Sequence, residues 1–118
     1  MSFEVRRIYE PTTTQGLRIL VERLWPRGLS KEAAALDDWL KDVAPSSELR
    51  KWFSHEPERW DGFRERYHAE LDRNHEAVAR LLAIGERRKV WLLFSSREER
   101  FNNAVALRDY LRSIRASS

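Results

Sequence analysis

The sequence contains no cysteine among its 118 residues. Without a thiol the chain cannot form a disulfide, use a thiolate nucleophile or build a cysteine-ligated zinc site. It also has no apolar run of the roughly 20 residues that a membrane-spanning helix requires, and its polar N-terminus lacks a signal-peptide pattern. These absences predict a cytoplasmic protein with no membrane partner.

The sequence also lacks a strong excess of charge of either sign. It has 22 Lys and Arg against 19 Asp and Glu, a formal net charge of +3, and 18 of the cations are arginine. A dedicated nucleic-acid binder shows a basic stripe that is missing here, so nucleic acid is disfavoured as a partner, although the five tryptophans could stack on bases. Arginine suits forked contacts with phosphate and carboxylate, but a genome rich in G and C would give the same bias.

Short apolar segments alternate with amphipathic segments along the chain. Residues 3–9, 17–24 and 90–94 are predicted as strands, and the last two carry apolar side chains in both directions, as strands buried on both faces of a parallel sheet do. A further strand at 39–43 competes with a helical interpretation of the same residues. The length suits one domain, so we predict a single α/β domain over residues 1–118, with a small, mainly parallel sheet of three or four strands flanked by helices.

Capping residues mark the beginnings of the predicted helices. Helices are expected to begin after the following residues: Ser30, Ser46 or Ser47, His55-Glu56 (with Pro57 as first residue), Asn74, and Asn102 or Asn103. Apolar side chains at helical spacing after Pro57 predict a face that packs on the core. Gly85 is expected to end the helix that follows Asn74. The segment at 12–16 is predicted as a polar loop, with a ligand contact by its threonines or glutamine as the alternative.

Residues 16–31 join an apolar strand to a helix start and carry four cations, of which Arg23, Arg27 and Lys31 are expected at the carboxyl end of the strand. Pro26 cannot donate to a sheet and Gly28 permits a tight turn, so the strand is predicted to end near Pro26. Because parallel strands end at a common edge, where ligands of α/β sheets bind, this loop and the loop after 90–94 are predicted to meet. The candidate anion-binding residues of the two loops are Arg23, Arg27, Lys31, Ser95, Ser96, Arg97 and Asn103. In the alternative interpretation the arginines are solvated or pair with Glu22 and Glu32.

Histidines are the remaining candidates for catalysis or metal binding. His55 would serve as a general acid or base if it faced the cleft, and helix capping is the alternative. A serine nucleophile after residues 90–94 has no base that the sequence identifies, so the sequence leaves open whether the protein is an enzyme. His68, Asp72 and His75 share a helical face, but a solvated polar face explains them better, and no metal or cofactor is predicted.

Three segments, RLWPRGLSK, APSSELRKWFSHEPERW and NNAVALRDYL, resemble the YeaO-like family, a bacterial family with a domain of unknown function. The resemblance covers residues 3–111 and implies a small single-domain α/β fold without an established activity, substrate or cofactor. The motif positions that it matches are Arg23, Trp25, Pro26, Arg27, Gly28, Lys31, Pro45, Ser46, Trp52, Asn103 and Ala104. Many relatives carry histidine where this chain has Phe101, and wider relatives carry a cysteine near Ser95 and Ser96, so a mechanism based on those groups is not expected here.

Two functions from different classes are therefore left by the sequence. The first is an anion-binding cleft at the carboxyl ends of the strands, acting on a phosphorylated or carboxylated small molecule. The second is a non-catalytic regulatory module that binds nucleic acid or a protein, with an exposed Trp25 or Trp52 as anchor. The sequence does not indicate an oligomeric state.

Overall fold

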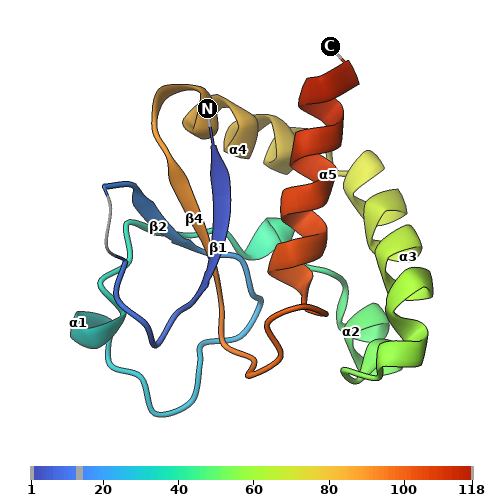
Figure 1. Ribbon diagram of the computed structural model, residues 1–118, viewed down its shortest axis with the longest axis horizontal. Helices are drawn as coiled ribbons and strands as arrows, with labels where there is room; N and C mark the ends of the chain where they lie inside the picture. The colour runs from blue at the N-terminus through green and yellow to red at the C-terminus, as the bar shows by residue number, and fades with distance from the viewer. Residues whose placement is uncertain (1, 13–14, 118) are drawn as a thin grey trace.

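The computed structural model of the chain describes residues 2–12 and 15–117 (Figure 1). Thr13 and Thr14, in the predicted polar loop, lie outside the described residues, so the ligand contact considered for them is not addressed. The described chain forms an α/β fold around one sheet in which every strand pair is parallel, as predicted. The strands, in their order across the sheet, are β1 (Phe3–Arg7), β4 (Val90–Phe94), β2 (Leu17–Leu20) and β3 (Asp38–Trp39).

Strand β4 lies in the middle of the sheet and is buried along its whole length. Its first residue, Val90, is in register with Phe3 of β1 and with Leu17 of β2. Leu93 of β4 is in register with Leu20, the last residue of β2. The carboxyl ends of β2 and β4 therefore lie side by side, which is the arrangement that the predicted cleft requires.

Helices connect the strands and pack on the sheet. In chain order the helical segments are α1 (Lys31–Ala34), η1 (Lys41–Val43), α2 (Ser47–Phe53), η2 (Pro57–Arg59), α3 (Trp60–Asp72), α4 (His75–Arg87) and α5 (Asn103–Ser117), where η marks a 3-10 turn. The predicted caps are confirmed at Ser30, Ser46 and Asn102, because their side-chain oxygens accept hydrogen bonds from the backbone N–H three residues later.

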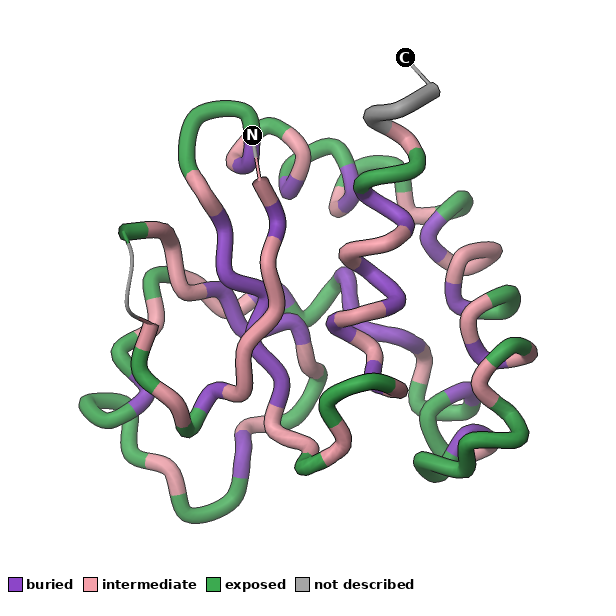
Figure 2. Tube along the Cα trace, in the orientation of Figure 1, coloured by how far each residue is buried: buried purple, intermediate pink, exposed green. Residues whose placement is uncertain are grey.

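The two faces of the sheet are covered unequally. Figure 1 shows α2, α3, α4 and α5 together on one side, and their inward side chains share the main core with Phe3, Ile19 and Leu92. The buried positions follow the sheet and the inner sides of these helices (Figure 2). On the other face, Leu20 and Leu93 share a smaller cluster with two strand tryptophans, the four-residue α1 and nearby loops. This face therefore depends on loops that are held in place by hydrogen bonds.

Arg18 supplies many of the hydrogen bonds that hold these loops. Its guanidinium group donates to the carbonyl oxygens of Ile8 (3.0 Å), Glu10 (3.2 Å) and Ala34 (3.0 Å). Partial burial lowers the pKa of Arg18, while the nearby carboxylate of Asp37 raises it. One strand residue thus fixes both the chain that leaves β1 and the end of α1.

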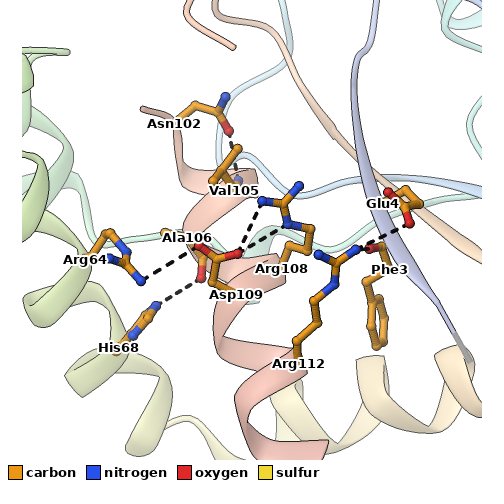
Figure 3. A network of polar contacts seen from close by, with 10 residues as sticks. All are labelled: Phe3, Glu4, Arg64, His68, Asn102, Val105, Ala106, Arg108, Asp109 and Arg112. Carbon is orange, nitrogen blue, oxygen red and sulfur yellow. Dashed lines mark hydrogen bonds and ion pairs between the residues drawn. The ribbon is translucent and has the colours of Figure 1, made fainter. Parts of the chain in front are cut away.

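Helix α5 is tied to β1 on one side and to α3 on the other (Figure 3). Arg112 donates to the carbonyl oxygen of Phe3 at 2.9 Å and lies 3.3 Å from the carboxylate of Glu4. From α3, the ring nitrogen Nε2 of His68 lies 3.0 Å from the carbonyl oxygen of Ala106. These contacts fix the orientation of α5, and with it the position of Asn103 at its first turn.

Three strand predictions extended beyond the observed strands. The first, at 3–9, is β1, which ends at Arg7. Strand β2 ends at Leu20 rather than near Pro26. Asn103 Nδ2 donates a hydrogen bond to the carbonyl oxygen of Val21 at 2.8 Å, so a side chain takes the place of the next strand-to-strand hydrogen bond. Leu24, predicted to lie on a buried strand face, is 60% exposed. The strand predicted at 39–43 is β3 followed by the 3-10 turn η1, which curls to bury Val43 in the core.

The predicted role of Gly85 as the end of a helix is wrong. Helix α4 continues to Arg87, and Gly85 is buried inside it. A Cβ atom at this position would lie 2.3 Å from Cζ of Phe3, closer than real Cβ atoms approach another atom. Glycine is required here because the ring of Phe3 packs directly on the helix backbone.

Candidate functional site

The loops that follow β2 and β4 converge, as predicted from the parallel arrangement. Ser95 donates to the carboxylate of Glu22 from its hydroxyl at 2.7 Å and from its backbone N–H at 3.1 Å. Arg7, at the end of β1, donates to the carbonyl oxygens of Ser95 (3.4 Å) and Ser96 (2.9 Å). Three neighbouring strand ends are therefore joined by hydrogen bonds at one edge of the sheet.

These strand ends border a cavity of ≈ 280 Å³, here named the strand-end cavity. Its polar lining residues are Glu22, Arg23, Arg27, Arg50, His55, Ser95, Ser96 and Asn103. Its apolar lining residues are Leu24, Trp25, Pro26, Ala44, Pro45, Phe53 and Phe63. The cavity thus combines cationic groups with an apolar wall, as small-molecule sites with a few oriented polar groups do.

The positive charge of the cavity comes from Arg23, Arg27 and Arg50. None of the ion pairs formed among the described residues involves any of these three guanidinium groups. The ion-pair alternative for Arg23 and Arg27 is therefore not found in the described chain. Arg23 instead points its guanidinium group at the carbonyl oxygens of Ala44 and Pro45, at 3.3 and 3.5 Å.

The loop that carries Arg27 is held by aromatic and backbone contacts. Trp25 Nε1 donates to the carbonyl oxygen of Leu29 at 2.6 Å, and the Trp25 ring lies edge-on to Trp39 with centroids 5.3 Å apart. The hydroxyl of Tyr9 donates to the carbonyl oxygen of Arg27 at 3.1 Å. Gly28 has φ = 71°, which confirms the predicted tight turn. The backbone of this loop is therefore fixed although the Arg27 side chain is exposed.

Two phenylalanines of the apolar lining come from α2 and α3. The rings of Phe53 and Phe63 stack with centroids 4.4 Å apart, and both side chains are buried. Phe53 also contacts Trp60 and His55, with centroid distances of 5.8 and 5.7 Å. The core prediction for the aromatic face of α3 is confirmed, but part of that aromatic layer also reaches the cavity.

The structure brings together five of the seven predicted anion-binding residues. Arg23, Arg27, Ser95, Ser96 and Asn103 line the strand-end cavity. The other two, Lys31 at the start of α1 and Arg97 in the loop after β4, are exposed and do not line it.

The hydroxyl groups of both serines in the loop after β4 form hydrogen bonds within the protein, which the sequence did not indicate. The hydroxyl of Ser95 donates to Glu22, and the hydroxyl of Ser96 accepts from the backbone N–H of Glu98 at 2.8 Å. Each hydroxyl therefore has a partner within the protein. Their main effect is to shape the edge of the cavity and to hold the carboxylate of Glu22.

His55 lines the strand-end cavity, as general acid–base chemistry would require. It does not cap a helix: Ser54 is the C-cap of α2, and Glu56 precedes η2. Ser54 and His55 both have positive φ, 44° and 56°, a left-handed conformation that is uncommon for two successive residues other than glycine. This turn aims the imidazole back toward Phe53 rather than along the next helix.

Arg50 was missed by the sequence reasoning. It lies on α2 three residues before Phe53, so both side chains share one side of the helix and reach the same cavity. The spacing of Arg50 and Phe53 is a signal that the sequence contains. Glu22 was considered only as a partner for arginine, whereas its carboxylate accepts hydrogen bonds from Ser95.

A second, more open cavity of ≈ 490 Å³ lies between η1 and α4. It shares Arg23 with the strand-end cavity, but Asp42 and Glu76 accompany its cations. One of those cations, Arg80, is also paired with Asp38 at 3.3 Å. The cations of this second cavity are therefore largely balanced by carboxylates, unlike those of the strand-end cavity.

The face considered for a metal is engaged in other contacts. His68 contacts Ala106 O, and Asp72 accepts a hydrogen bond from the hydroxyl of Tyr110 at 2.7 Å. Across residues 2–12 and 15–117 no group of three histidine or acidic side chains is placed to hold a metal ion. In the same part of the chain, no helix combines the length and apolar character needed to cross a bilayer.

Comparison with known proteins extends the resemblance seen in the sequence motifs. A family model described as the inactive DUF488-N3 subclade matches residues 2–117. The chain is 43% identical over 115 residues to the uncharacterized protein YeaO of Escherichia coli K12, an alignment that covers 97% of this chain and 100% of that protein. It is 40% identical over 108 residues to the uncharacterized proteins Mb3100c of Mycobacterium bovis and Rv3073c of Mycobacterium tuberculosis, with 91% of each chain covered. No solved structure matches it. The chain therefore belongs to the DUF488-N3i family, as a YeaO-like domain of unknown function.

Proposed function

We propose that this protein binds a small phosphate- or carboxylate-bearing molecule in the strand-end cavity and does not transform it. The observation that carries the proposal is the set of Arg23, Arg27 and Arg50, which line one cavity without an ion-pair partner among the described residues. A cytoplasmic location, which the sequence predicts, would expose the cavity to many such metabolites.

Charge complementarity favours an anion as the ligand. Like charges that converge on one cavity repel one another, and a bound anion removes that repulsion while it accepts hydrogen bonds from the guanidinium groups. The one carboxylate in the lining, that of Glu22, bonds to Ser95, and among the described residues it forms no ion pair with the three arginines, so the lining keeps an excess of positive charge. Arginine also presents planar pairs of donors that match the oxygens of phosphate and carboxylate.

The contacts around Ser95 favour binding over catalysis. A serine nucleophile needs a base that removes its proton, and the hydroxyl of Ser95 instead donates to the carboxylate of Glu22 at 2.7 Å rather than to an imidazole. His55 shares the cavity, but none of the hydrogen bonds of the described residues joins it to either serine. The family description, an inactive subclade, agrees with a binding role.

Binding of nucleic acid or of a protein through an aromatic anchor has less support. All five tryptophans, including Trp25 and Trp52, are buried or half-buried, so they offer no open face for stacking or insertion. Binding to a generic oligonucleotide that falls steeply as salt increases would favour the nucleic-acid alternative instead.

Titration with inorganic phosphate, followed by calorimetry and by amide chemical shifts, tests the proposal. We expect saturable binding to the parent protein. Arg27→Ala and Arg50→Ala should each weaken it by about 10- to 30-fold, because each removes a charge-assisted contact of roughly 2 kcal/mol. Both side chains are exposed, so the variants should keep the parent fold. Arg97→Ala is the matched control, because it removes an exposed arginine that does not line the cavity.

Three results would contradict the proposal. One is a parent protein that does not bind phosphate at tens of millimolar. Another is an Arg97→Ala variant that loses as much affinity as Arg27→Ala. The third is turnover, which would appear as release of phosphate from phenyl phosphate at a rate that depends on His55 and would restore the enzymatic hypothesis.

A further inference from the structure

We propose that the molecule bound in the strand-end cavity is a single aromatic ring that carries a phosphate or carboxylate group. The inference rests on the anion binding proposed above and adds the class of ligand. It follows from the apolar part of the cavity, which an inorganic anion would leave without a partner.

The arginines and several apolar side chains line the same cavity. Among the apolar ones are Phe53 and Phe63, buried and stacked at 4.4 Å. From the loop after β2 comes Leu24, which is 60% exposed. Large apolar side chains with such exposure are few in the described chain, where Tyr9 is the other. The two phenylalanine rings are already buried, so an apolar group bound in the cavity would remove mainly the exposed surface of Leu24 from water.

The ring contacts favour an aromatic over an aliphatic group. Phe53 already packs against Phe63, His55 and Trp60 at centroid distances between 4.4 and 5.8 Å, so a further ring would extend an existing aromatic cluster. Aromatic pairs at such distances contribute beyond the area that they bury. Guanidinium groups also stack on aromatic faces, so Arg27 and Arg50 could contact both the ring and its anionic group.

The volume of the cavity limits the size of the ligand. At about 30 Å³ for each water-sized group, a cavity of ≈ 280 Å³ holds roughly nine such groups. Benzoate has nine non-hydrogen atoms and phenyl phosphate has eleven, whereas a nucleotide has more than twenty. One ring with one anionic group therefore matches the volume of the cavity.

Four probes separate the contributions of ring and anion: inorganic phosphate, phenyl phosphate, benzoate and cyclohexanecarboxylate. We expect phenyl phosphate to bind at least about tenfold more tightly than inorganic phosphate, and benzoate more tightly than the saturated ring of the same size. Leu24→Ala should weaken the binding of phenyl phosphate by about threefold and leave the affinity for inorganic phosphate unchanged. Arg27→Ala should weaken both phosphates.

Each outcome decides between this inference and the proposed function. If inorganic phosphate binds as tightly as phenyl phosphate, or if cyclohexanecarboxylate equals benzoate, the aromatic ligand class is refuted while anion binding stands. If none of the four probes binds, both proposals are refuted. The inference holds if phenyl phosphate binds more tightly than inorganic phosphate and benzoate binds more tightly than cyclohexanecarboxylate. Whichever of phenyl phosphate and benzoate binds more tightly then identifies the anionic group.

Discussion

Replacement of Glu22 by glutamine should have opposite effects on stability and on anion affinity. In the parent protein the Glu22 carboxylate accepts from the Ser95 hydroxyl at 2.7 Å and from its N–H at 3.1 Å. Glutamine has nearly the same shape, and its amide can still bond to the N–H and to the hydroxyl, which then accepts. Only the charge assistance is lost, so we expect a decrease of about 1 kcal/mol in the free energy of unfolding, or about 4 °C in Tm.

The same substitution removes a negative charge from the wall of the cavity. A cavity of ≈ 280 Å³ is about 8 Å across, so the Glu22 carboxylate and a bound anion lie on the order of 6–8 Å apart, where their repulsion is roughly 1 kcal/mol after screening by water and salt. Glu22→Gln should therefore bind inorganic phosphate about fivefold more tightly. Calorimetric titration measures the affinity and thermal unfolding measures the stability of the same sample.

Glu32→Gln is the matched control, because Glu32 is an exposed carboxylate on α1 that does not line the cavity. It changes the net charge by the same amount and should change neither affinity nor stability. A Glu22→Gln variant with unchanged or weaker phosphate binding would refute the placement of the anion beside Glu22. An unchanged stability would show that the contacts with Ser95 contribute nothing to the fold.

The remaining predictions concern the fold. Gly85→Ala should lower the free energy of unfolding, measured by urea denaturation, by about 2–3 kcal/mol, because the new Cβ would overlap the ring of Phe3. Adding Phe3→Leu to the Gly85→Ala variant should recover part of that loss. Ala35→Gly should raise the stability by about 1 kcal/mol in the same assay, because Ala35 has φ = 49° and is exposed; no change would mean that the strain is absent. Burial and the hydrogen bond to Asp72 raise the pKa of Tyr110 to about 12, so its contribution to stability is complete below pH 10 and is lost as the pH rises from 10 through 12. Denaturation at about pH 9 and about pH 11 should show a smaller alkaline loss for Tyr110→Phe than for the parent, and equal losses would contradict this account.

The sequence predicts the fold class because its strands carry a local signal. Residues 90–94 are apolar on both faces, and only a strand in the middle of a covered sheet, such as β4, buries all five. The ends of elements carry a weaker signal. Strand β2 ends early because Asn103, more than eighty positions away, bonds to Val21. No window of neighbouring residues contains that information.

The site could be predicted as far as it depends on topology. Parallel neighbours bring Arg27 and Ser95 to one edge of the sheet whatever the details of their loops. Which cations then face the cavity depends on how each loop turns. Lys31 and Arg97 turn outward, whereas Arg50 enters from α2 because Phe53 of that helix stacks on Phe63 of α3. That contact joins two helices, and no single segment reveals it.

The order of the strands has a consequence for synthesis. Strands β1 and β2 each pair with β4, at residues 90–94, and not with each other. A nascent chain of only 89 residues therefore lacks the strand that joins them into one sheet. Until then both strands hold unpaired backbone groups that other chains can bind. Premature termination anywhere before residue 90 should therefore leave a product that aggregates, and folding should begin only once most of the polypeptide has emerged.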